Sequence, residues 1–215
     1  MTSDFPPDDP KELAGFPTAD IQFSYFRVHR AVNDARYFGA NGLGRYDDPR
    51  GPEGQFGTCY LAGTEAGAFL ETLSGFRPLP EDLVNERRMS ELRVDPSGPI
   101  ADVTHESVVG DYGIFGDLSA DGGRQLTQQW ALAFWQAGFG GVQYRAHHHP
   151  GFSEQALALF GPPGVQSADG TDGPVLLEYL KPEPEGGPEP ISDGLLQEME
   201  ERFRIFVIPS APLPF

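Results

Sequence analysis

The sequence contains very little cysteine and lysine, and both shortages limit what the protein can be. Its single cysteine, Cys59, cannot form an internal disulfide or a paired-cysteine metal site. We interpret Cys59 as a small buried residue of a strand. The five histidines form no second ligand cluster beside the run at 147–149, so we expect no bound metal.

Long apolar runs and an excess of positive charge are also missing. No stretch approaches the roughly 18 apolar residues of a membrane helix, so we expect no membrane association. The formal net charge of −17 repels nucleic acids and anionic membranes, and we expect no direct binding of nucleic acid. The start of the chain is acidic and proline-rich, unlike a signal peptide, which makes the cytoplasm the expected location.

Three widespread site motifs are absent as well. The chain has no GxGxxG between a strand and a helix, so a Rossmann cofactor site is unsupported. It has no GxxxxGKS or GxxxxGKT phosphate loop, and no GxSxG turn for a serine nucleophile. Any active site therefore has to be built from other residues.

What the sequence does have is a cluster of arginines. Five of the fifteen basic residues lie in one short window: Arg27, Arg30, Arg36, Arg45 and Arg50. Three aspartates share this window, which leaves it net positive inside a strongly acidic protein. Because guanidinium groups bind phosphate oxygens two at a time, the cluster indicates a site for an anionic small molecule.

Apolar patterns predict an α/β protein. The expected strands cover 21–29, 57–62, 89–94, 99–103, 139–144, 156–160 and 175–180. Thr64 caps a helix whose apolar stripe is Ala66, Phe69, Leu70 and Leu73, and a second helix covers 123–137. The glycine-rich segment 39–57 is a long loop of the kind that is usually functional or disordered.

Composition divides the chain into four parts. Residues 1–20 are expected to be a flexible N-terminal arm, and 21–180 the catalytic domain. Residues 181–190 read as a Pro/Glu/Gly linker. The remaining 191–215 are predicted to form a helix and a strand that pack back on the same domain, since they are too few for a domain of their own.

Four chemically suited residues stand on successive elements: Arg27, Arg45, Tyr60 and Glu71. Arginines would hold a pyrophosphate, and a tyrosine ring would lie against a flat cationic base. A carboxylate would stabilise the oxocarbenium-like charge that grows on a ribose as its base departs. Each residue alone has a simpler explanation, such as a solvated surface side chain for Glu71, so the order of the four carries the hypothesis.

These residues lie in stretches that resemble the RES family, named for its Arg, Glu and Ser. The resemblance spans residues 24–162. The matching stretches are 26–30 (FRVHR), 44–46 (GRY), 59–62 (CYLA), the helix at 65–73, 138–145 (GFGGVQYR) and 156–160 (ALALF).

The resemblance implies a fold, a substrate and roles for individual residues. The fold would be α/β (α+β), a single ADP-ribosyltransferase-like domain of mixed β-sheets flanked by helices. The substrate would be NAD, attacked without a metal, as in the NAD-degrading toxins of RES–Xre pairs. Arg27, Arg45 and Tyr46 would bind NAD phosphates or ribose. Tyr60 would contact the nicotinamide side, and Glu71 would be the catalytic acid, with Arg27 also in the catalytic set.

The family's serine is missing from its usual place. It stands two residues after the tyrosine of the Gly-Val-x-Tyr strand, where this chain has Ala146. Ser153, seven residues further on, could reach the same pocket and complete the catalytic set. If it does not, the enzyme would be slowed, altered or directed to another substrate.

Three functions remain open. The first is cleavage of the nicotinamide–ribose bond of NAD by a glycohydrolase or phosphorylase. The second is transfer of ADP-ribose to a protein target. The third is an NAD-binding module with impaired catalysis, which Ala146 supports. A cognate antitoxin is the partner that the resemblance implies, and a homodimer is also left open.

Overall fold

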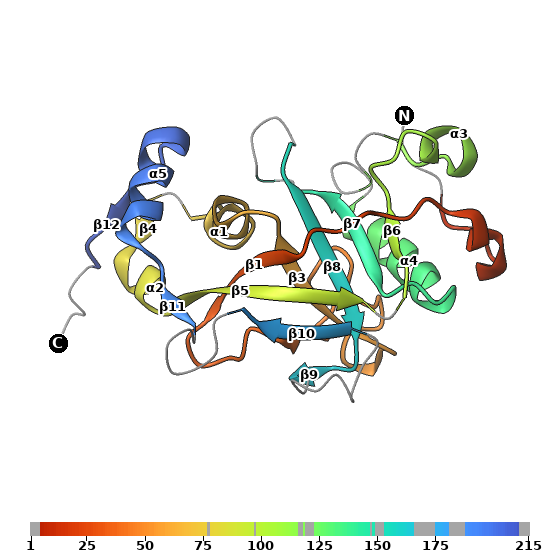
Figure 1. Cartoon of the computed structure of the whole chain (residues 1–215), viewed down its shortest axis with the longest axis horizontal. Helices are drawn as coiled ribbons and strands as arrows, with labels where there is room; N and C mark the ends of the chain where they lie inside the picture. The colour runs from red at the N-terminus through yellow and green to blue at the C-terminus, as the bar shows by residue number, and fades with distance from the viewer. Residues whose placement is uncertain are drawn as a thin grey trace.

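The computed structural model describes residues 5–76, 78–96, 98–115, 118, 123–146, 148, 153–165, 175–180 and 188–210. Its centre is a mixed, eight-stranded sheet flanked by helices (Figure 1). In spatial order the main path is β10 (Val175–Tyr179), β5 (Arg87–Pro96), β1 (Ser24–Arg30), β3 (Gly57–Ala62), β8 (Gln155–Gly161), β7 (Gly141–Arg145) and β6 (Ile100–Asp102). The short β11 (Glu189–Pro190) pairs with β5. The predicted α/β class is therefore confirmed.

The sheet parts in its middle, between β1 and β3. These two strands pair only at Phe26 opposite Ala62. By contrast, β1 pairs with β5 over seven residue pairs and β3 with β8 over six. In Figure 1, β1, β5 and β10 run across the view while β7 and β8 run steeply. The sheet thus consists of two halves that meet at a narrow seam.

One long helix packs beside this seam, and a second packs against β7. The helix α1 (Glu65–Leu73) begins at the predicted cap, where Thr64 Oγ1 accepts the backbone N–H of Gly67 at 3.0 Å, and it contacts β1 and β3. Its whole predicted stripe is buried. The helix α4 (Gly123–Gln136) ends at Gly138, whose φ of +86° suits a glycine in the left-handed region. The shorter helices are α2 (Glu81–Asn85) and α3 (Val108–Tyr112).

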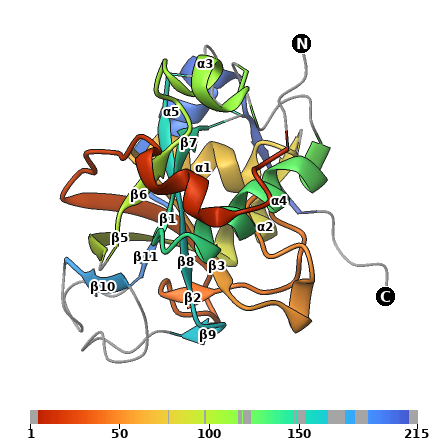
Figure 2. The ribbon, with the colours of Figure 1, turned by 90° about the vertical axis from the view of Figure 1, so that its right-hand side faces the viewer.

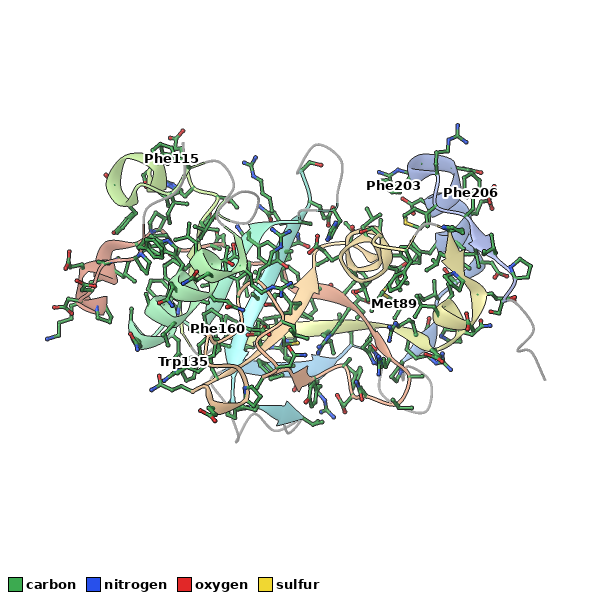
Figure 3. All side chains as sticks on the ribbon, turned by 180° about the vertical axis from the view of Figure 1, so that it is seen from behind. Met89, Phe115, Trp135, Phe160, Phe203 and Phe206 are labelled. Carbon is green, nitrogen blue, oxygen red and sulfur yellow. The ribbon has the colours of Figure 1, made fainter. Side chains whose placement is uncertain are left out.

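Side chains of β8 connect two of the three apolar clusters. Leu157 and Leu159 pack into one cluster with Cys59, while Ala158 and Phe160 point into the cluster around α4. Successive residues of a strand face opposite sides, so β8 is buried on both faces. The third cluster joins α1 to the C-terminal helix, and Figure 3 shows its Met89 to the right of Trp135 and Phe160, which belong to or border the cluster around α4.

Part of the predicted N-terminal arm packs on the domain. Residues Pro10–Gly15 form a 3-10 helix, η1, that lies beside α4 (Figure 2). Leu13 and Phe16 are buried in the cluster around α4. The ring centroids of Phe16 and Phe134 are 4.7 Å apart. The proline-rich composition hid these two apolar anchors, which hold this part of the segment on the domain.

The C-terminal segment packs on α1. Ser192 caps α5 (Asp193–Phe203) by accepting the Leu195 N–H, and Leu195 and Met199 are buried in the cluster with α1. The strand β12 (Val207–Ile208) runs parallel to β4 (Leu79–Pro80). Residues 181–187 of the predicted linker lie outside the described part, whereas its last two form β11. Within the described residues, no helix has the length and hydropathy to cross a membrane.

Candidate functional site

A cavity of about 870 Å³ opens at the seam of the sheet. Its wall comes from β1, β3, α1 and the glycine-rich loop, with Tyr144 from β7, Arg87 from β5, Arg124 from α4 and His148 beyond β7. Four arginines and two carboxylates line it. The loose pairing of β1 and β3 leaves room here for a ligand between elements far apart in the sequence.

The structure brings four of the predicted site residues to this cavity. Arg27, Arg45, Tyr60 and Glu71 all line it. Tyr46 does not, because its side chain is fully buried behind the wall, with its ring centroid 4.9 Å from that of Tyr144. It lines a smaller cavity of about 150 Å³ on the far side of Tyr144.

The serine positions lie outside the cavity wall. Ala146 is completely buried in the cluster around α4. Ser153 is exposed and precedes β8, and it is not among the lining residues. The pocket therefore holds Glu71 and the arginines without a serine among its described lining residues.

Hydrogen bonds from the Nη1 atom of Arg27 hold this side chain in place. This atom donates hydrogen bonds to the carbonyl oxygens of Ala35 and Tyr37, the latter at 2.8 Å, and lies 3.1 Å from the Cys59 sulfur. Cys59 is buried as predicted, and burial raises the pKa of its thiol while Arg27 opposes that rise. The guanidinium is thus fixed before any ligand arrives.

The loop that carries Arg45 is fastened at Gly44. The side chain of Gln128 on α4 donates through Nε2 to the carbonyl oxygens of Gly42 and Gly44, both at 2.9 Å. A Cβ at Gly44 would overlap the hydroxyl of Tyr60 and the carboxylate of Asp47. Only glycine fits this close approach.

Tyr60 supports the loop from the floor of the cavity. Its hydroxyl donates to Asp47 at 2.8 Å and accepts the backbone N–H of Tyr46 at 2.9 Å. Burial, and then the charge of Asp47, raise the pKa of Tyr60 well above its ordinary value. The hydroxyl therefore stays protonated at neutral pH. Tyr60 has a structural task here in addition to lining the cavity.

Tyr144 links the basic and acidic parts of the wall. It is buried, and the burial raises its pKa well above the ordinary value; Glu71 raises it further, while Arg45 lowers it. Both charges thus act on the same hydroxyl, which keeps its proton at neutral pH. Arg45 and Glu71 consequently belong to one electrostatic site.

Glu71 lies on the side of α1 away from its apolar stripe. Its side chain is half-buried rather than fully solvated, and its Oε1 accepts the backbone N–H of His148 at 3.2 Å. This hydrogen bond ties α1 to the segment after β7. It holds the carboxylate at the cavity wall.

Three arginines of the cluster, Arg30, Arg36 and Arg50, do not line the cavity. Arg36 pairs with Asp34, and Arg50 pairs with Asp48, each through Nε and Nη2. Some arginines of the cluster therefore stabilise the fold through ion pairs, and others line the cavity.

Several lining residues escaped the sequence analysis. Asp47 and Tyr144 stand within or beside the matched motifs, so their position was a usable signal. Arg87 and Arg124 stand in no recognisable motif, His148 belongs to the histidine run at 147–149, and only the fold brings the three to the cavity. Within the described residues, no group of three or more His, Cys, Asp or Glu side chains could hold a metal.

Comparisons with known proteins agree with this architecture. The chain is similar in structure to a chain of the M. tuberculosis MbcT–MbcA toxin–antitoxin complex, with 18% identity, a TM-score of 0.61, and coverage of 89% of this chain and 96% of that one. At this identity the similarity establishes the fold alone. No curated protein matches the sequence. The model of the RES domain matches residues 24–178, most of the chain, and the protein therefore belongs to the RES domain family.

Proposed function

We propose that this protein is a toxin-like enzyme that cleaves the nicotinamide–ribose bond of NAD, as a glycohydrolase or phosphorylase. The observation that carries the proposal is the convergence of Arg27, Arg45 and Glu71 on one cavity, from a strand, a loop and a helix. Membership in the RES family supports the choice of NAD as substrate.

The two arginines would bind the pyrophosphate of NAD. Both line the cavity, and Arg27 is already oriented by the carbonyl oxygens that accept from its Nη1. Because this guanidinium is fixed before binding, little ordering entropy is lost when phosphate oxygens meet it. The protonated hydroxyl of Tyr144 can donate a further hydrogen bond to the ribose or phosphate.

Glu71 would stabilise the charge that develops in the reaction. As nicotinamide leaves, the C1′ carbon of the ribose gains oxocarbenium-like positive charge. A carboxylate held at the cavity wall by the His148 N–H would stabilise that charge at the moment it forms. Water or phosphate would then complete the cleavage.

The test is release of nicotinamide from NAD by the purified full chain, with and without added phosphate. Free ADP-ribose indicates hydrolysis, and a phosphorylated ADP-ribose that appears only with phosphate indicates phosphorolysis. We expect Glu71→Gln to lower the rate at least about 100-fold, since a group that acts on developing charge is lost. Glu65→Gln is the matched control, because Glu65 is an exposed glutamate in the first turn of the same helix.

A second candidate is an NAD-binding module with impaired catalysis. It is favoured by the buried Ala146 and by Ser153, which lies outside the lining of the cavity. Saturable NAD binding in calorimetry without any product would support it over the enzyme. Ser153→Ala separates the two roles of the serine: a slower reaction places Ser153 in catalysis, and an unchanged rate removes it.

Transfer of ADP-ribose to a protein is the remaining alternative. Labelled NAD added to a cell lysate with the protein would leave label on a distinct protein band in that case. Free labelled ADP-ribose alone would favour cleavage.

We also propose a cognate antitoxin as partner and the cytoplasm as the site of action. The structurally similar MbcT–MbcA complex pairs a toxin with an antitoxin, and NAD is an intracellular substrate. Expression of the intact protein should arrest growth, and Glu71→Gln should relieve the arrest.

A further inference from the structure

Arg87 is the least expected cation in the cavity wall. It is the first residue of β5, lies opposite Arg30 of β1 in the ladder, and stands in none of the stretches that predicted the site. Like charges directly opposite one another on neighbouring strands repel. The fold therefore places Arg87 where its charge is unfavourable unless an anion joins it.

The immediate surroundings of Arg87 leave its Nε without an acceptor. Its Nε is buried and has no hydrogen-bond partner among the residues that the structure describes. Burial lowers the pKa of Arg87, and the charge of Arg30 lowers it further, against a smaller opposing effect of Glu86. A buried donor without an acceptor is destabilising, and an anion bound in the cavity beside the guanidinium would offset the unfavourable charge of Arg87.

The other arginines of the same strand are different. Arg88 donates through Nη1 to the carbonyl oxygens of Asn85 and Arg87, and Arg93 pairs with Glu178 at 3.4 Å. Neither lines the cavity. A buried, unsatisfied Nε is thus a property of Arg87 and not of the other arginines of β5.

The pleat of the sheet separates Arg87 from Arg27. Arg27 lies opposite Ser90, three residues along β5 from Arg87, a distance of about 10 Å along the strand. Because three is an odd number, the two side chains leave the sheet on opposite faces. Arg87 shares its face with Val28, and Val28 and Thr72 of α1 both line the cavity.

We infer that Arg87 marks a second oxyanion subsite of the cavity, on the α1 face and apart from the Arg27–Arg45 pair, that takes a phosphate group. A guanidinium binds phosphate through two parallel hydrogen bonds, and the Thr72 hydroxyl on the same wall can add a third. The phosphate could belong to a dinucleotide that carries an additional phosphate, such as NADP, or be free inorganic phosphate. The inference uses the proposed function only for the identity of the dinucleotide.

The experiment measures binding by the full chain, with calorimetry against inorganic phosphate, NAD and NADP as separate probes. Arg87→Gln is compared with Arg87→Lys and with Arg93→Gln, the control on the same strand. We expect Arg87→Gln to weaken the binding of either NADP or inorganic phosphate by about tenfold or more, while its affinity for NAD is unchanged. Arg87→Lys should retain part of the affinity, and Arg93→Gln all of it.

The probes distinguish the source of the phosphate. A loss confined to NADP assigns the subsite to a third phosphate of the dinucleotide, and a loss for inorganic phosphate assigns it to the free ion. Equal affinities of the intact protein and Arg87→Gln for every probe, or no saturable binding of either phosphate probe, would overturn the inference.

Two further measurements separate weaker binding from unfolding and from loss of catalysis. Because Arg87→Gln removes repulsion with Arg30, its melting temperature should equal or exceed that of the intact protein, so weaker binding cannot come from unfolding. Binding needs no turnover. Arg87-dependent phosphate binding without NAD cleavage would refute the proposed function and leave the subsite standing, and cleavage without that binding would do the reverse.

Discussion

Arginines that lie close together in the sequence have two different fates in this protein. In 34–36 and 48–50 the aspartate accepts three hydrogen bonds from the arginine two residues later, from its backbone N–H, Nε and Nη2. Arg27 and Arg45 have no acidic residue two positions before them, and both line the cavity. A nearby aspartate of this kind thus marks an arginine that stabilises its loop and does not serve the site.

The strongest test of this difference replaces one arginine that lines the cavity and one that pairs with an aspartate. Arg45→Gln should lower kcat/KM for NAD cleavage by about 100-fold or more, because a charged contact to the reacting dinucleotide is lost. Arg50→Gln, five residues on in the same loop, should change it by less than about threefold. Steady-state rates of nicotinamide release check both variants. Equal losses would mean that Arg50 also serves the site.

Disturbing the loop beneath Arg45 should have the next largest effect. Gly44→Ala places a methyl group against the Tyr60–Asp47 hydrogen bond, and we expect it to lower the free energy of unfolding by about 1–3 kcal/mol. It should also raise KM, since Arg45 is the next residue. Gly110→Ala is the control, because a Cβ there meets no atom within 4 Å. Urea denaturation of both variants measures the difference, and equal stabilities would show that the loop yields freely.

The two aspartates should also differ from each other. The side chain of Asp48 is 1% exposed and that of Asp34 is 26% exposed. Each aspartate accepts a fourth hydrogen bond, Asp48 from the Gln55 N–H at 2.7 Å and Asp34 from the Tyr179 hydroxyl at 3.0 Å. We expect Asp48→Asn to cost about 2 kcal/mol of stability and Asp34→Asn about 1 kcal/mol, since the hydrogen bonds of Asp34 are more exposed to water. Chemical denaturation at neutral pH orders the two, and a reversed order would contradict the importance of burial.

Acid should weaken these pairs by a smaller amount. Burial alone raises the pKa of Asp48, but hydrogen bonds from Arg50 and Gln55 outweigh it and leave the pKa below the ordinary 3.8. A carboxyl group whose pKa is lower in the folded state stabilises the fold at pH values above its pKa in the unfolded state. This contribution is lost as the pH falls through its pKa in the folded state. Unfolding free energy should therefore fall below about pH 4. The fall should be shallower in Asp48→Asn, and an identical acid profile would count against the pair.

Much of the local structure could be read from the sequence. The strand at 57–62, the helix capped by Thr64 and the strand at 175–179 appear where apolar periodicity placed them. Packing contacts were harder to predict where composition masked a few apolar residues. The proline-rich start hides Leu13 and Phe16, and both are buried.

The site was only partly predictable for a different reason. Arg27, Arg45, Tyr60 and Glu71 were selected by residue type and order, and the fold brings all four to one wall. Arg87 and Tyr144 join them through pairings between β1 and β5 and between β7 and β8, whose partners are far apart in the chain. Tyr46 was selected with Arg45, yet its ring turns into the core.

The sequence by itself determined which segments are strands and helices, because periodic burial is written into neighbouring residues. It also determined which arginines are held by their own aspartates, since that contact spans two residues. Only the tertiary structure decided that the sheet parts between β1 and β3 and that a cavity opens there. Strand order and register join distant residues, and they alone determine which charges meet across that cavity.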